Sequence, residues 1–128
     1  MRWKNVKRDP ADIAFSRYIR LRAGWRCEKC KTQHEEGGLQ CSHFIGRRNE
    51  AVRFDDENCK ALCGGCHMFL TANPQLHRDW MLSQLGEERY KKLILRSNTY
   101  HRKDRKMALI IAKAQLAELE KRLGISKP

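Results

Sequence analysis

The sequence predicts an α+β fold that is mostly helical, and three observations lead to this expectation. Four segments lie between helix start and helix stop signals, at residues 10–22, 74–85, 87–96 and 104–123. Two short apolar stretches, residues 39–44 and 60–62, flank a polar and irregular segment, as the strands of a small hairpin do. With 128 residues, the chain has the size of one domain.

The first helix is predicted from its two ends. Asp9-Pro10 is typical of an N-cap followed by proline at the first helical position, and Gly24 is a stop signal. Apolar residues recur at helical spacing and are expected to face the core: Ile13, Ala14, Tyr18 and Leu21. Three arginines of this helix are then expected to point largely outward: Arg17, Arg20 and Arg22.

The middle of the chain is predicted to form a hairpin followed by a helix. Gly37-Gly38 is a turn signal before the strand at residues 39–44. Residues 45–57 are polar and form a loop, after which the second strand, near residues 60–62, leads into a turn and a helix that begins near it.

Helices are expected throughout the C-terminal half. Asn73-Pro74 begins one that Gly86 ends, residues 87–96 form the next, and the last closes at Gly124. In the last helix an apolar stripe recurs at steps of three and four: Leu109, Ala112, Leu116, Leu119 and Leu123. We expect this stripe to pack against the protein's own helices, with a homodimer seam as the alternative.

The formal net charge of +12 is unevenly distributed along the chain. Residues 1–31 carry ten Lys or Arg and three acids, residues 32–67 carry four and six, and residues 68–128 carry thirteen and six. Basic flanks around a slightly acidic centre predict a polyanion as partner, with solvated helix faces as the alternative. No apolar run approaches the roughly 20 residues of a membrane span, and the N-terminus lacks a signal-peptide core, so a cytoplasmic protein is expected.

Four of the six cysteines form two Cys-x2-Cys pairs, Cys27 with Cys30 and Cys63 with Cys66. In a reducing cytosol such spacings are more often metal ligands than disulfides. Each pair forms a tight knuckle that presents both sulfurs to one point, so the two pairs together predict a structural Zn²⁺.

The other two cysteines, Cys41 and Cys59, fall outside these pairs. We expect both to be small buried hydrophobes. The alternative is that Cys59 or His34 replaces one of the four zinc ligands.

Three polar residues that could take part in catalysis lie between the pairs or directly after them. His43 is on the first predicted strand, Asn58 precedes the second, and His67 directly follows Cys66. A zinc knuckle at each end of a 32-residue gap would fix this segment, so these residues can converge on one pocket.

The ordered combination of these motifs resembles the HNH, or His-Me finger, nucleases that carry a structural zinc. Within that class it is most similar to the NinG or Rap recombination proteins of lambda-type phages. The resemblance covers roughly residues 14–123 and is carried by Ala14-Phe15-Ser16-Arg17-Tyr18-Ile19-Arg20, Cys27-x2-Cys30, Ser42-His43-Phe44, Arg53-Phe54-Asp55-x2-Asn58 and Cys63-x2-Cys66. It implies a ββα-metal finger with a structural zinc held by four cysteines, flanked by an N-terminal helix and C-terminal helices.

The resemblance implies a role for each of the three polar residues. His43 stands where the family has the general base that activates a water for attack on a phosphodiester, and an imidazole suits that task near neutral pH. Asn58 stands where a side-chain amide fixes the loop. His67 stands where the family places a ligand for a catalytic divalent ion.

Two departures from the HNH pattern concern that ion. Ser42 occupies the position where many of these enzymes have Asp or His as a second ligand, so Asp55 or Asp56 is expected to assist His67. The lambda-type protein has Asn at the position of His67. A nitrogen ligand makes Mn²⁺ as acceptable as Mg²⁺, and both stay open as the catalytic cofactor.

Arginines and lysines of the loop and of the C-terminal helices are expected to bind DNA phosphates. This set comprises Arg47, Arg48, Arg53, Lys91, Lys92, Arg102, Lys103, Arg105 and Lys106. For Arg53, an ion pair with Asp55 or Asp56 is the alternative. A basic arm before the first helix adds further cations: Arg2, Lys4, Lys7 and Arg8.

Together these expectations describe a single domain: a basic arm and helix at residues 1–26, a zinc-stapled HNH core at 27–73, and a basic helical extension at 74–128. The resemblance implies an endonuclease acting on branched recombination intermediates such as Holliday junctions, D-loops and flaps, in a bacterial host cytoplasm if phage-encoded. The alternatives are a non-catalytic zinc-finger module that binds DNA and an HNH nicking nuclease that cuts ordinary duplex DNA.

Overall fold

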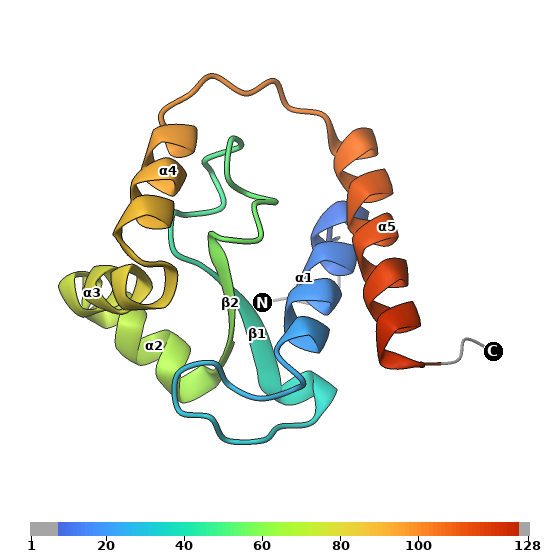
Figure 1. The fold of residues 1–128 in the computed structure, drawn as a ribbon, viewed down its shortest axis with the longest axis horizontal. Helices are drawn as coiled ribbons and strands as arrows, with labels where there is room; N and C mark the ends of the chain where they lie inside the picture. The colour runs from blue at the N-terminus through green and yellow to red at the C-terminus, as the bar shows by residue number, and fades with distance from the viewer. Residues whose placement is uncertain (1–7, 126–128) are drawn as a thin grey trace, which may run out of the picture.

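The computed structural model of the protein describes residues 8–125 and shows a mostly helical α+β fold (Figure 1). A short 3₁₀ turn, Glu36–Gly38, precedes the first strand. The elements are α1 (Pro10–Arg22), β1 (Leu39–His43), β2 (Cys59–Cys63), α2 (Gly64–Ala72), α3 (Pro74–Leu85), α4 (Glu87–Ser97) and α5 (Arg105–Leu123). The predicted class and the predicted elements are confirmed, with boundaries that differ by one or two residues.

Helix α1 begins as the sequence predicts, because the Asp9 carboxylate accepts a hydrogen bond from the Ala11 amide at 2.8 Å and Pro10 follows the cap. Its buried face differs in part from the predicted one. Leu21 is buried as expected, and Ala14 and Tyr18 are partly buried against the core. The other buried positions are Ala11, Phe15 and Ile19, at steps of four. Ile13 is 49% exposed, so it lies outside the face of α1 that packs against the hairpin and α5.

Arg22 corrects a second expectation about α1. Its guanidinium does not point outward but donates to the backbone carbonyls of Asp56 and Cys59, both at 3.0 Å. The end of α1 is thereby attached to the start of β2.

The sheet is an antiparallel pair of β1 and β2. Its register places Leu39 opposite Cys63 at one end and His43 opposite Cys59 at the other. Helix α2 begins directly after β2, so the second Cys-x2-Cys pair spans the end of the strand and the first turn of the helix.

Helix α5 packs along α1, and Figure 1 shows the two side by side, with α2, α3 and α4 on the other side of the hairpin. Ala112 and Leu119 of α5 are buried, and Ala112 belongs to the same core cluster as Phe15 and Ile19. The predicted packing of the apolar stripe within the chain is therefore confirmed for these two positions, whereas Leu123 is 54% exposed.

A second core cluster supports the loop between the strands. Val52 of the loop is fully buried with Met81, Leu85 and Leu93 of α3 and α4. The loop is thus anchored on the C-terminal helices by apolar burial. Within residues 8–125, every helix is too short or too polar to cross a bilayer.

Candidate functional site

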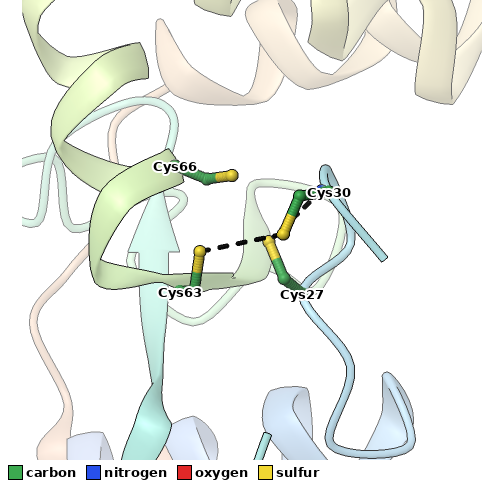
Figure 2. A group of neighbouring side chains, drawn as sticks. All are labelled: Cys27, Cys30, Cys63 and Cys66. Atoms are coloured by element: carbon green, nitrogen blue, oxygen red, sulfur yellow. Dashed lines mark hydrogen bonds between the residues drawn. The ribbon is translucent and has the colours of Figure 1, made fainter. Parts of the chain in front are cut away.

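The two Cys-x2-Cys pairs meet in space, although their members are more than 30 residues apart in sequence (Figure 2). The sulfurs of Cys27, Cys30, Cys63 and Cys66 all lie within 4.8 Å of one another, and Cys30 Sγ is 3.9 Å from Cys63 Sγ. Four thiolates in a tetrahedron with Zn–S bonds of about 2.3 Å would be about 3.8 Å apart. The cluster can therefore hold a structural metal such as zinc.

The sulfurs of the cluster lie in unlike surroundings. Hydrogen bonding to Thr32 lowers the pKa of Cys30 to about 6, whereas burial raises the pKa of Cys66 to about 12. Metal binding therefore requires that Cys66 release a proton near neutral pH. Among the described residues, His34 and Cys59 do not belong to this cluster, so the structure brings neither alternative ligand to it.

His43 is the last residue of β1 and is held by the loop that follows it. Its Nε2 lies 2.9 Å from the backbone carbonyl of Arg53. A carbonyl oxygen only accepts, so Nε2 carries the proton and Nδ1 keeps a lone pair. Burial lowers the pKa of His43 below its ordinary value, against the opposing effect of the Arg53 carbonyl, so the ring is neutral at pH 7.

Asn58 organises the loop between the strands. It is fully buried, and its Nδ2 donates to the carbonyls of Ile45 and Val52 at 2.9 and 3.0 Å. Its Oδ1 accepts from the Ile45 amide at 2.8 Å. One side chain thus satisfies three backbone groups of the loop, the positioning role that the resemblance implies for this residue.

His67 lies on the first turns of α2 and shares a cleft with His43. Its Nδ1 is hydrogen-bonded to Gln40 Oε1, and because an amide oxygen only accepts, Nε2 keeps a lone pair. The cleft has a volume of about 870 Å³ and lies between α1 and β1, with both histidines in its lining. The structure therefore brings His43 and His67 to one surface, with Asn58 buried behind the loop.

The two acids predicted to assist His67 lie elsewhere. The Asp55 carboxylate accepts from Arg96 at 2.6 and 3.1 Å and lines a separate cavity of about 570 Å³ against α5. Asp56 offers its backbone carbonyl to Arg22, and it is absent from the described residues that line the cleft. The structure does not bring either carboxylate to His67.

Two acids do line this cleft: Asp9, the N-cap of α1, and Asp12 of α1. Asp12 was not predicted from the sequence as a site residue. Asp12 receives Arg53 Nε at 3.0 Å and Arg47 Nη2 at 2.9 Å, with a second, shorter contact from Arg53. Although burial raises the pKa of Asp12, the hydrogen bond from Arg53 and the charge of Arg47 lower it overall.

This ion pair corrects the interpretation of Arg53. Its partners are Asp12 and Glu50, not Asp55 or Asp56, because the loop folds back over α1. Asp12 holds the side chain of Arg53, and the backbone carbonyl of Arg53 accepts the hydrogen bond from the His43 imidazole. Asp12 is thus a positioning residue for His43.

Replacing Asp12 with asparagine is expected to lower the free energy of unfolding by about 1–3 kcal/mol, because Arg53 loses its charged partner while each side chain is only 14% exposed. The lowered pKa of Asp12 means that this stabilisation is present at neutral pH and is lost as the pH falls through the acidic range. Urea unfolding at pH 7 measures the difference.

The matched control for Asp12 is Glu87→Gln, which removes an exposed ion pair with Lys91. Its unfolding midpoint should equal that of the wild type. Equal midpoints for all three proteins would show that Asp12 does not hold the loop.

The cations predicted to contact DNA fall into two groups. Arg105 is held by Glu50 and by Asp9, the latter at 3.0 Å, and Lys91 pairs with Glu87 at 2.9 Å. Arg47 and Arg53 pair with Asp12, as described above. The remaining side chains of the set are exposed: Arg48, Lys92, Arg102, Lys103 and Lys106. Arg8 lines the cleft, and the rest of the predicted arm, with Arg2, Lys4 and Lys7, lies outside the described residues.

A second cluster of possible metal ligands was not predicted from the sequence. Side-chain ligand atoms of Cys41, His43 and Cys59 all lie within 4.8 Å of one another. Cys59 is fully buried, as expected for a small hydrophobe, but Cys41 is half-buried and lines the cleft. Only the register of the hairpin, which places Cys59 opposite His43, brings the three together.

Comparison with protein families finds a match. The family model described as Bacteriophage Lambda NinG protein matches residues 4–122, nearly the whole chain. No curated protein and no solved structure matches.

Proposed function

The chain belongs to the family of the bacteriophage lambda NinG protein, and from this premise we propose that it is a metal-dependent DNA endonuclease of the HNH, ββα-metal class. The observation that carries the proposal is the state of His43. A neutral imidazole at the end of β1 donates Nε2–H to a loop carbonyl and keeps its Nδ1 lone pair, beside a cleft that His67 also lines.

In the proposed reaction, His43 Nδ1 takes a proton from the water whose oxygen bonds to the phosphodiester phosphorus. The bond from phosphorus to the 3′ oxygen breaks, and that oxygen leaves with the electron pair. Asn58 holds the loop whose Arg53 carbonyl keeps the ring oriented and in the required tautomer. The chain's cations bring the phosphate into the cleft, where Arg47 is 57% exposed and can leave Asp12 at little cost.

The residues present fit a catalytic divalent ion through His67. Its Nδ1–H is fixed by Gln40, and this second hydrogen bond is typical of histidines that ligate metals through the other nitrogen. Mg²⁺ usually keeps several waters and takes substrate phosphate oxygens, so His67 would be one ligand among waters and phosphate oxygens. When bound, Mg²⁺ or Mn²⁺ would stabilise negative charge on the transition state and the leaving oxygen.

The proposed substrate is branched DNA: Holliday junctions, D-loops or flaps. The proposal is supported by the family membership. It also agrees with binding through phosphates, because such contacts position a protein on DNA without reading the base sequence. A nicking nuclease acting on ordinary duplex and a DNA-binding zinc module without activity are the two competing functions.

Three DNA substrates separate these functions. A four-way junction, a flap and a linear duplex are incubated with the full chain at one salt concentration, with Mg²⁺ or Mn²⁺, and both binding and cleavage are measured. The proposal predicts faster cleavage of the branched molecules than of the duplex. Equal cleavage of all three supports the nicking nuclease, and binding without cleavage supports the zinc module.

The exposed cations before and at the start of α5 should supply affinity for DNA. Changing Arg102, Lys103 and Lys106 to glutamine is expected to weaken binding to all DNA shapes alike. The slope of log affinity against log salt is negative, and each lost phosphate contact reduces its magnitude by about 0.9. The magnitude should therefore decrease by up to about 3 in the triple variant. Fluorescence anisotropy over a salt series measures it.

A charge-matched control for these cations is the triple variant with glutamine at Lys113, Lys121 and Arg122, exposed residues further along the same helix. It should keep the wild-type slope. If both triple variants change the slope equally, net charge rather than this surface governs binding.

A further inference from the structure

A second cluster of possible metal ligands includes His43, the proposed general base. We propose that Cys41, His43 and Cys59 bind a thiophilic ion such as Zn²⁺, and that this ion inhibits DNA cleavage by occupying His43. The binding rests only on the geometry of the hairpin, whereas the inhibition rests on the proposed function.

The hairpin arranges the three ligands. Cys41 and His43 are two residues apart on β1, so their side chains leave the same face of the strand. Cys59 is the register partner of His43 on β2. The three ligand atoms lie within 4.8 Å of one another, a spacing that a small relaxation converts to the roughly 3.5–3.8 Å of a tetrahedral zinc site.

The hydrogen bond of His43 is the second observation that points to a metal. Histidine ligands almost always donate their other ring N–H to a carboxylate, a backbone carbonyl or water. His43 does so, since Nε2 lies 2.9 Å from the Arg53 carbonyl, and Nδ1 keeps the lone pair that a metal needs.

An ion can reach this site from the cleft. Cys41 and His43 are half-buried and line the cleft, while Cys59 is fully buried beneath them. Two thiols and one imidazole select Zn²⁺ over Mg²⁺ or Mn²⁺, since the latter two prefer oxygen ligands. Both thiols release their protons on binding, and a water from the cleft can complete the tetrahedron.

Metal binding and catalysis then compete for one lone pair. A zinc ion on His43 Nδ1 prevents that nitrogen from taking a proton from water. Zinc at the four-cysteine cluster would not compete with catalysis, because that cluster shares no residue with Cys41, His43 and Cys59. Zinc is therefore expected to stabilise the protein at one site and to inhibit it at the other.

Metal stoichiometry tests the binding. The full-length wild type and Cys41→Ser are titrated with Zn²⁺ against a chromophoric chelator, and bound metal is counted by mass spectrometry. Cys41 is half-buried, so serine should be accommodated, which a thermal melt checks. The wild type should bind about two ions per chain and the variant about one. Equal stoichiometry would overturn the proposal.

Inhibition is tested in the cleavage assay with saturating Mg²⁺ and increasing Zn²⁺. Cys41→Ser should need about tenfold more Zn²⁺ for half inhibition than the wild type does. Equal sensitivity would place the inhibitory ion elsewhere and contradict the competition. If the wild type cleaves no DNA at all, the proposed function fails, whereas the stoichiometry still decides whether this site exists.

Discussion

Replacing His43 with alanine is expected to lower the rate of DNA cleavage by about 10²- to 10⁴-fold, the usual contribution of a general base. The imidazole is held by the Arg53 carbonyl on one nitrogen and leaves the other free, and alanine offers no lone pair there. Single-turnover cleavage of a four-way junction measures the rate. DNA binding should change little, because the substitution leaves the chain's Lys and Arg residues in place.

The pH dependence gives an independent measure of the same residue. Burial lowers the pKa of His43, so the wild-type rate should stay level as the pH falls to about 6.5, the ordinary value for histidine, and decline only below it. Protonation is disfavoured in the folded state, so the contribution of His43 to stability is complete above that value and declines as the pH falls below it. A rate for His43→Ala within threefold of the wild-type rate would contradict its assigned role.

Replacing Cys63 with serine is expected to release the structural metal and to unfold the core. Structural zinc sites contribute about 10–16 kcal/mol to the folding of zinc-finger peptides, which is comparable to the whole free energy of unfolding of a typical protein, about 5–15 kcal/mol. Cys63 ends β2 and precedes α2, so its loss separates the hairpin and helix from the loop after α1. Circular dichroism and zinc content measure both effects.

The matched control for Cys63→Ser is Cys41→Ser, which changes a cysteine of the same strand pair outside the four-cysteine cluster. It should keep the secondary structure and the structural ion. A Cys63→Ser protein that melts at the wild-type temperature would show that the cluster does not stabilise the fold.

The helices could be predicted because their ends are local signals. Asp9 caps α1 through its own side chain, two residues from the amide that it accepts from. Gly86 and Gly124 adopt positive φ values of 81° and 71° where α3 and α5 end, a conformation that glycine adopts without strain. Such interactions depend on neighbouring residues, so they are visible in the sequence.

The surroundings of the loop could not be predicted, since its partners are distant in sequence. Three acids lie within three residues of Arg53: Glu50, Asp55 and Asp56. Arg53 pairs with Glu50, but it donates hydrogen bonds to Asp12, 41 positions away, and not to Asp55 or Asp56. Asp55 is likewise taken by Arg96 of α4. Which acid meets which arginine depends on how the loop folds over α1 and against α4.

The candidate site shows both situations. In the sequence, His43 and Asn58 lie between the two Cys-x2-Cys pairs and His67 directly follows the second pair. The structure brings both histidines to one cleft. The cluster of Cys41, His43 and Cys59 depends instead on the strand register, since a shift by one residue would turn Cys59 to the opposite face.

The central claim is that the chain hydrolyses DNA with a divalent ion, and the most direct test measures the ion dependence of cleavage. A labelled four-way junction is incubated with wild-type protein that carries one zinc ion per chain, with no free Zn²⁺, in Mg²⁺, in Mn²⁺, and without either ion. The account predicts discrete cleavage products only when an ion is added, and none after the ion is chelated. Tight binding of the junction without cleavage in either ion would contradict it.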